Sequence, residues 1–158
     1  MQLYNKLSAN ERAILIEKAG NRRITLSFYK YHQIKNTSLF RDHLYLMWEK
    51  LDVLGRIYIA SEGINAQLSM PSQNLNEFKT KLDSIDFLKE IRLNVAVEQD
   101  DFSFLKLKVK IRNKIVADGL SENSFDLSNN GTHVNASEFN TLIENPNTLL
   151  VDMRNHYE

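Results

Sequence analysis

Apolar and polar residues alternate in several stretches of the chain, which is the pattern of strands with one buried face. The clearest alternation covers residues 23–31. The stretch 56–69 contains two alternating arms around Ser61-Glu62-Gly63, and this predicts a hairpin with a three-residue turn that needs its glycine. Residues 91–98 alternate again. We therefore expect four strands between residues 23 and 98.

Apolar residues three or four positions apart indicate amphipathic helices around these strands. The spacing predicts helices over 8–20, 36–55 and 71–88. Ser8 and Glu11 have the spacing of a capping box, which is expected to start the first of these helices. Gly55 is expected to end the second helix. The large side chains expected in the core are Phe28, Trp48, Phe78 and Leu93.

The order strand, helix, strand, strand, helix, strand predicts an α+β, ferredoxin-like (split βαβ) fold, in which two helices cover one face of an antiparallel sheet. We expect the first strand to pair between the third and the second. A further alternating stretch over 104–119 adds a strand region. The first domain, with its N-terminal helix, is therefore expected to cover residues 1–119.

Residues 120–134 are rich in Ser, Asn and Gly, a composition typical of a linker. After them, Asn135 and Glu138 again have capping-box spacing, and the apolar run at 148–151 predicts a short buried strand. A strand that begins a new unit cannot bury itself alone. Residues 135–158 are therefore expected to be the incomplete beginning of a second domain.

Composition narrows the chemistry that this chain can perform. It has no cysteine, which excludes disulfides, thiolate metal sites and a cysteine nucleophile within these 158 residues. The four histidines show no metal-ligand spacing, so no metal site is expected. The chain has no long aliphatic run and no secretory leader, and we expect a cytoplasmic protein without a membrane partner. A net charge of zero argues against general coating of nucleic acid, but a local basic surface is still compatible with it.

The polar face of the predicted sheet combines tyrosines with arginine and amide side chains. Ferredoxin-like sheets use such faces to stack and hydrogen-bond single-stranded RNA. An ordinary solvated face, or one covered by a neighbouring domain, explains the same pattern, and the third strand lacks aromatic residues. The residues expected on this face are Tyr29, Tyr31, Arg56, Tyr58, Asn65, Gln67, Arg92 and Asn94.

Basic residues alternate with apolar ones from 106 onward, and no acidic residue interrupts them. On a strand this pattern places the cations on one side, where they suit a line of phosphates. The alternative is protection of an edge strand, for which lysine is a common device. The basic residues of this stretch are Lys106, Lys108, Lys110, Arg112 and Lys114.

Motifs of enzymatic chemistry are scarce. Glu62 in the hairpin turn and Asn65 after it are candidates for contact with a substrate or another domain, and Glu62 also for a general base or ligand. The simpler explanation is that Glu62 is solvated while Gly63 makes the turn and Asn65 caps its hydrogen bonds. The segment YKYHQIKN after the first strand lacks the glycine-bearing anion loop of an acylphosphatase-type site. No catalytic residue is assigned.

Several motifs together resemble the bacterial rhodanese-domain tRNA uridine hydroxylases: SFYKY, GRIYIASEGINAQLS, KVKIRNKIVADG and LLVDMRNHYE. Members of that family join an N-terminal ferredoxin-like domain to a rhodanese domain and a cysteine-bearing tail. Asp152, Arg154 and Glu158 match the Asp-x-Arg-x-x-x-Glu pattern that follows the first strand of a rhodanese domain.

The resemblance implies an oxidoreductase that converts the wobble uridine of tRNA to 5-hydroxyuridine, with molecular oxygen as co-substrate and no evident cofactor. The implied partners are tRNA and the protein's own rhodanese domain. A tRNA substrate favours the RNA-binding interpretation of both surfaces. The family's essential cysteine would lie beyond Glu158, so this chain alone is expected to be inactive. A rhodanese-type sulfurtransferase, and a non-catalytic module that packs on its own rhodanese domain, stay open as alternatives.

Overall fold

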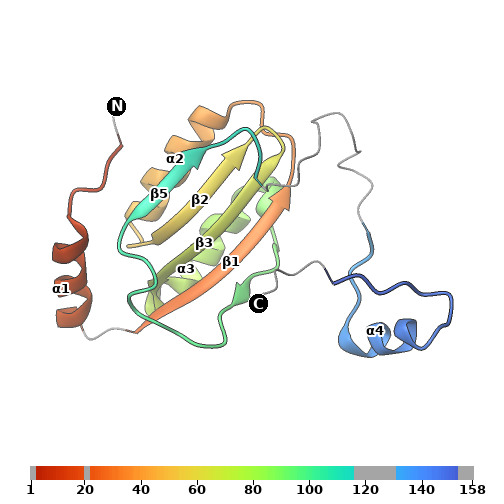
Figure 1. The fold of residues 1–158 in the computed structure, drawn as a ribbon. Helices are drawn as coiled ribbons and strands as arrows, with labels where there is room; N and C mark the ends of the chain where they lie inside the picture. The colour runs from red at the N-terminus through yellow and green to blue at the C-terminus, as the bar shows by residue number, and fades with distance from the viewer. Residues whose placement is uncertain (1–2, 20–21, 116–130, 153–158) are drawn as a thin grey trace. The chain divides into compact units, whose positions relative to one another are not determined.

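A five-stranded sheet forms the centre of the first part of the chain in a computed structural model that describes residues 3–19, 22–115 and 131–152 (Figure 1). The strand order is β4-β1-β3-β2-β5, and the first four strands form the antiparallel, ferredoxin-like arrangement that the sequence predicts. β5 pairs with β2 in parallel, which makes the sheet mixed. The strands are β1 (Arg23–Tyr31), β2 (Leu54–Ala60), β3 (Gly63–Pro71), β4 (Asn94–Val95) and β5 (Leu107–Ile111).

The predicted position of the first strand is wrong. β1 lies between β4 and β3, and not between the third and the second strand. The hairpin explains this order. Because Ala60 pairs with Gly63, only Ser61 and Glu62 join β2 to β3, a loop one residue shorter than predicted. The two strands must then be neighbours, and β3 takes the place beside β1.

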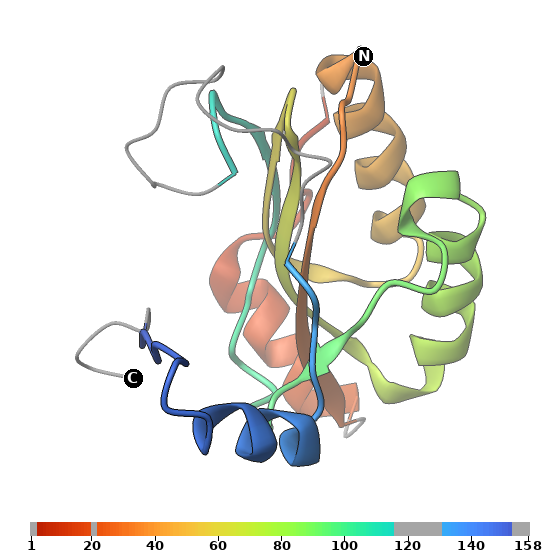
Figure 2. The same cartoon turned by 90° about the vertical axis from the view of Figure 1, so that its right-hand side faces the viewer.

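Helices α2 (Thr37–Glu49) and α3 (Leu75–Asp83) cover the same face of the sheet (Figure 2). α1 (Ala9–Ala19) precedes the sheet and begins at the predicted capping box. There the Glu11 N–H donates to Ser8 Oγ at 3.2 Å, and the Ser8 N–H donates to Glu11 Oε2 at 2.8 Å. Single 3-10 turns flank α3 at Ser72–Asn74 and Asp86–Leu88.

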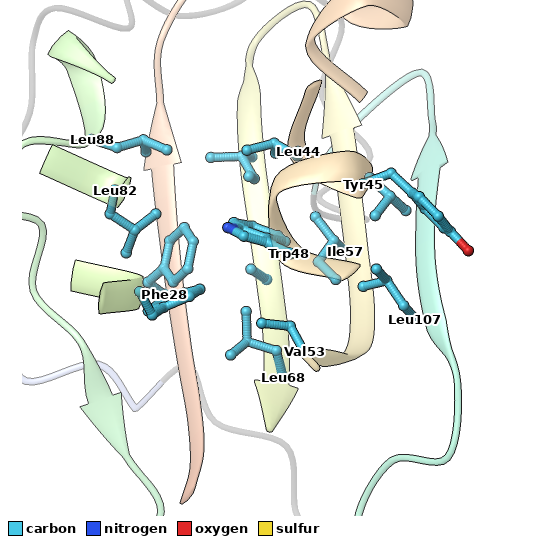
Figure 3. Close-up of a cluster of buried hydrophobic side chains, with 14 of the residues drawn as sticks. Phe28, Leu44, Tyr45, Trp48, Val53, Ile57, Leu68, Leu82, Leu88 and Leu107 are labelled. Carbon is cyan, nitrogen blue, oxygen red and sulfur yellow. The ribbon is translucent and has the colours of Figure 1, made fainter. Parts of the chain in front are cut away.

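The apolar core lies between the sheet and helices α2 and α3 (Figure 3). Trp48 of α2 is fully buried at its centre. Its ring lies edge-on to Phe28 of β1, with 6.4 Å between ring centroids, and 5.7 Å from Phe78 of α3. The predicted burial of these three aromatic residues is confirmed, and their contacts join both helices to the sheet.

The fourth strand is much shorter than predicted, because it pairs with only two residues of β1. The predicted burial of Leu93 is wrong, since its side chain is only half-buried, and Val97 is fully exposed. Beyond the short ladder, the side-chain oxygen of Gln99 accepts the Thr25 N–H at 2.7 Å. The Ala96 N–H still donates to the Thr25 carbonyl at 2.9 Å, but a side chain takes the place of the backbone acceptor for the Thr25 N–H, and the strand ends there.

Gly55 does not end α2 as predicted. The helix ends at Glu49, and Gly55 lies inside β2, where a Cβ would clash with the backbone of Gln67 and Leu68 in β3. Gly63 is under a similar constraint, because a Cβ there would clash with the Lys30 carbonyl of β1. Both glycines therefore permit a close approach of neighbouring backbones.

The chain divides into two compact units, Met1–Leu127 and Ser128–Glu158, and their boundary falls inside the predicted linker 120–134. Most of that linker lies outside the described residues. In the second unit, α4 (Ala136–Ile143) begins at the predicted capping box of Asn135 and Glu138.

The predicted buried strand at 148–151 is wrong. Leu149, Leu150 and Val151 are exposed and form no strand, because no described segment of the second unit pairs with them. The interpretation of residues 135–158 as the beginning of a rhodanese-like domain stays a prediction. Of its motif, Asp152 is described and engaged in a contact, whereas Arg154 and Glu158 lie outside the described residues.

Candidate nucleic-acid interface

The face of the sheet opposite α2 and α3 carries a group of polar side chains, and we call it the open face. Residues paired in register on neighbouring strands point to the same side of a sheet. One row across the open face therefore contains Tyr29, Asn65, Tyr58 and Lys110. A second row, two residues along, contains Asn94, Ser27, Gln67, Arg56 and Lys108.

The predicted alternation of cations along β5 is present. Leu107 and Val109 are buried on the helix side, and the cations between and around them are exposed. We call the four exposed cations the basic stripe, which consists of Lys106, Lys108, Lys110 and Arg112. None of the four has an ion-pair partner among the described residues.

β5 is also an edge strand, and lysines on such a strand can protect it against pairing with another chain. One part of its free edge is already covered, because the side chain of Asn5 accepts the Leu107 N–H and donates to the Leu107 carbonyl, both at 2.9 Å. An amide side chain thus imitates a neighbouring strand at this residue. The lysine side chains rise from the open face, away from the plane in which the edge hydrogen bonds lie.

The tyrosines of the open face differ in how accessible their rings are. Tyr29 is 55% exposed and meets Tyr31 edge to face, with 6.5 Å between ring centroids. Tyr58 is half-buried, and the Arg112 guanidinium lies over its ring at 5.4 Å from the centroid. Tyr29 is therefore the better candidate for stacking on a base, whereas the ring of Tyr58 already has a partner.

The hairpin tip holds the segment that leaves the sheet. Glu62 Oε1 accepts the Ile115 N–H at 2.8 Å, and Asn65 Nδ2 donates to the Ile115 carbonyl at 3.2 Å. Ile115 itself is only 3% exposed. We call these three residues the exit latch. Both candidate side chains are thus engaged within the chain itself, and their contact with a substrate stays a prediction.

Three of the predicted RNA-binding residues differ from the basic stripe in their surroundings. Arg92 is exposed but precedes the short β4, outside the registered rows. Lys114 is half-buried and already engaged in a contact, as is Tyr31. The basic stripe, Arg56, Tyr29 and Tyr58 therefore lie together on the open face. Arg92, Lys114 and Tyr31 lie at its margin.

Two N–H groups of the loop after β1 are already bonded within the chain. The N–H groups of His32 and Ile34 donate to the Glu62 and Ser61 carbonyls at 2.9 and 2.8 Å, so they are turned toward the hairpin tip. Within the described ranges, no group of three or more His, Asp or Glu side chains could hold a metal ion. No helix in the same ranges is long and apolar enough to cross a membrane.

Comparison with known proteins places these features in a family. The sequence matches the UPF0176 acylphosphatase like domain over residues 23–115, which include all five strands. A tRNA uridine(34) hydroxylase from Leptospira interrogans is 54% identical over 99% of this chain and 42% of its own length. Proteins of the same name from Photorhabdus laumondii and Yersinia pestis are each 46% identical over 99% of this chain, which corresponds to 45% and 44% of their lengths. The resemblance to tRNA uridine hydroxylases is confirmed, and the chain spans less than half the length of these curated relatives.

Proposed function

The chain belongs to the family of UPF0176 acylphosphatase like domains, and we propose that it is the tRNA-binding N-terminal part of a tRNA uridine(34) hydroxylase. In this proposal a longer protein converts the wobble uridine to 5-hydroxyuridine, with molecular oxygen as co-substrate and the catalytic cysteine on its rhodanese domain. The residues of the open face carry out no step of the oxidation. Their part is to bind the tRNA in the cytoplasm and present it to the rest of the protein.

The observation that carries the proposal is the segregation of charge on one face. The whole chain has 20 basic and 20 acidic residues, yet the basic stripe contains four exposed cations with no acidic neighbour in sequence. Tyr29 lies on the same face with its ring exposed. Cations that neutralise phosphates and aromatic rings that stack on bases are the two usual components of a single-stranded RNA surface.

The test is the salt dependence of tRNA binding. Replacing Lys106, Lys108 and Lys110 together by Gln should weaken binding across tRNA sequences and flatten the slope of log K against log salt by roughly 0.7 to 0.9 for each phosphate that is no longer neutralised. A matched control removes the same charge from three exposed lysines on the helix side, Lys79, Lys81 and Lys89, and should leave the slope unchanged.

The Tyr29→Ala variant completes this experiment. If a base stacks on the ring, the variant should lose roughly 1–3 kcal/mol of binding free energy with little change in slope. Tyr58→Ala should cost less, because Arg112 covers that ring. If the lysine variant aggregates but binds tRNA with unchanged affinity and slope, the stripe protects an edge and the proposal fails.

A further inference from the structure

A pocket opens where β5 begins, beside the first turn of α1. It has a volume of about 280 Å³ and is lined by Ala9, Gly55, Arg56, Ser103, Phe104, Leu105, Lys106 and Lys108. Three of these eight residues are cations and none is acidic. The space can hold a phosphate group together with several waters, since one water occupies about 30 Å³.

The register of the sheet forces two of these cations together. Arg56 of β2 and Lys108 of β5 are direct partners in the parallel ladder, and Lys106 lies two residues from Lys108 on the same side. Like charges directly opposite each other destabilise a sheet. Neither Arg56 nor either lysine has an ion-pair partner among the described residues to offset this repulsion. An anion in the pocket would supply the missing charge.

The side chains that line the pocket are of types that suit a phosphate group. Arg56 offers a planar fork that can hydrogen-bond two phosphate oxygens, and the two lysines add point charges from the neighbouring strand. The first turn of α1 contributes less, because the Glu11 carboxylate already accepts the Ser8 N–H at that helix end. The attraction therefore rests on the three cationic side chains, with Phe104 and Leu105 forming part of the pocket wall.

We propose that this pocket binds one phosphate group through Arg56, Lys106 and Lys108, and that in the tRNA complex the group is a backbone phosphate. The identification of the source as RNA rests on the proposed function, whereas phosphate binding itself does not. The pocket would fix the register of the RNA along the open face, with Lys110 and Arg112 following as looser contacts.

The experiment titrates the 158-residue chain with inorganic phosphate at constant ionic strength and follows the backbone amide NMR signals of residues 103–108. We expect saturable shifts. Lys108→Gln and Arg56→Gln should each weaken phosphate binding by about tenfold, the effect of losing one charge-assisted hydrogen bond. Lys110→Gln is the matched control, because Lys110 lies on the same strand and face but outside the pocket, and it should change the affinity by less than about twofold.

Shifts that grow without saturation, or equal effects of Lys108→Gln and Lys110→Gln, would overturn the pocket and leave only general attraction of anions. A second titration uses a uridine trinucleotide, with uridine nucleoside as the phosphate-free control. Displacement of phosphate by the trinucleotide supports a backbone phosphate as the ligand. If phosphate binds but the trinucleotide does not displace it, the RNA assignment is wrong. The salt-dependence experiment on tRNA then decides separately whether the proposed function survives.

Discussion

A single buried arginine joins three segments of the first unit. The Arg23 guanidinium donates to Asp52 Oδ2 at 2.8 Å, to the Asp52 carbonyl at 2.6 Å and to the Ser69 carbonyl at 3.1 Å, and the residue is only 3% exposed. Burial lowers the pKa of Arg23, and the hydrogen bond and charge of Asp52 oppose that shift. Asp52 is therefore the main group that stabilises this buried charge.

Replacing Asp52 by Asn should destabilise the chain. Asn tolerates the φ of 53° at this position, so the backbone can stay unchanged while the charge facing Arg23 is removed. We expect the free energy of unfolding to fall by about 2–3 kcal/mol, less than the roughly 3–5 kcal/mol for a fully buried pair, because Asp52 is partly exposed. Urea unfolding measures the change. The control Glu98→Gln, at an exposed residue, should stay within about 0.5 kcal/mol, and equal stability of the two variants would contradict this account.

Sequence patterns predict the aromatic core residues but not this arginine. Trp48 and Phe78 recur at helical spacing with other apolar residues, and hydropathy alone assigns them to the core. An arginine at the start of a strand is assigned to solvent by the same rule. The partners of Arg23 come from positions 29 and 46 residues away, so only the folded sheet brings them together.

At the scale of elements, the exit latch connects the hairpin tip to the segment that follows β5. Replacing Glu62 by Ala leaves the Ile115 N–H without its acceptor. We expect the Ile115 amide to exchange with deuterium about tenfold faster, since one hydrogen bond to a charged group contributes on the order of 1.5 kcal/mol or more. Ser61→Ala, in the same turn but with an exposed side chain, is the control. Unchanged protection of Ile115 in Glu62→Ala would mean that burial alone holds the segment.

The elements themselves were predictable where their signals are local. The three helices before residue 90, the capping box at Ser8 and the β2–β3 hairpin follow from periodicity and short-range spacing. The length of β4 and the parallel pairing of β5 do not, because both depend on a partner strand distant in sequence. The residues of the open face could be predicted from the alternation of side chains along each strand. The position of Arg112 over the ring of Tyr58 could not, because it depends on the three-dimensional arrangement.

At the scale of the whole molecule, the numbers of basic and acidic residues are equal, yet the basic stripe gathers four cations on the open face. The two units differ in how fully they bury their apolar side chains. The first encloses its own aromatic core, whereas the second leaves Phe139, Leu142 and Ile143 of α4 exposed. Binding can therefore be measured on the first unit's surface within this chain, while the proposed chemistry requires residues that the chain does not contain.

The chain alone should catalyse neither uridine hydroxylation nor cyanide-dependent sulfur transfer. The proposed hydroxylation depends on a cysteine of a rhodanese domain, and rhodanese-type sulfur transfer would depend on one as well, whereas these 158 residues include no cysteine. Nucleoside mass spectrometry of tRNA incubated with the chain in air should detect no 5-hydroxyuridine, and a thiocyanate assay should detect no product. tRNA binding measured in the same samples shows that the chain is folded and engaged, and a full-length relative provides the active control. Formation of either product by the chain alone would require a reaction without cysteine. It would refute the proposal that this chain binds tRNA while residues outside it carry out the reaction.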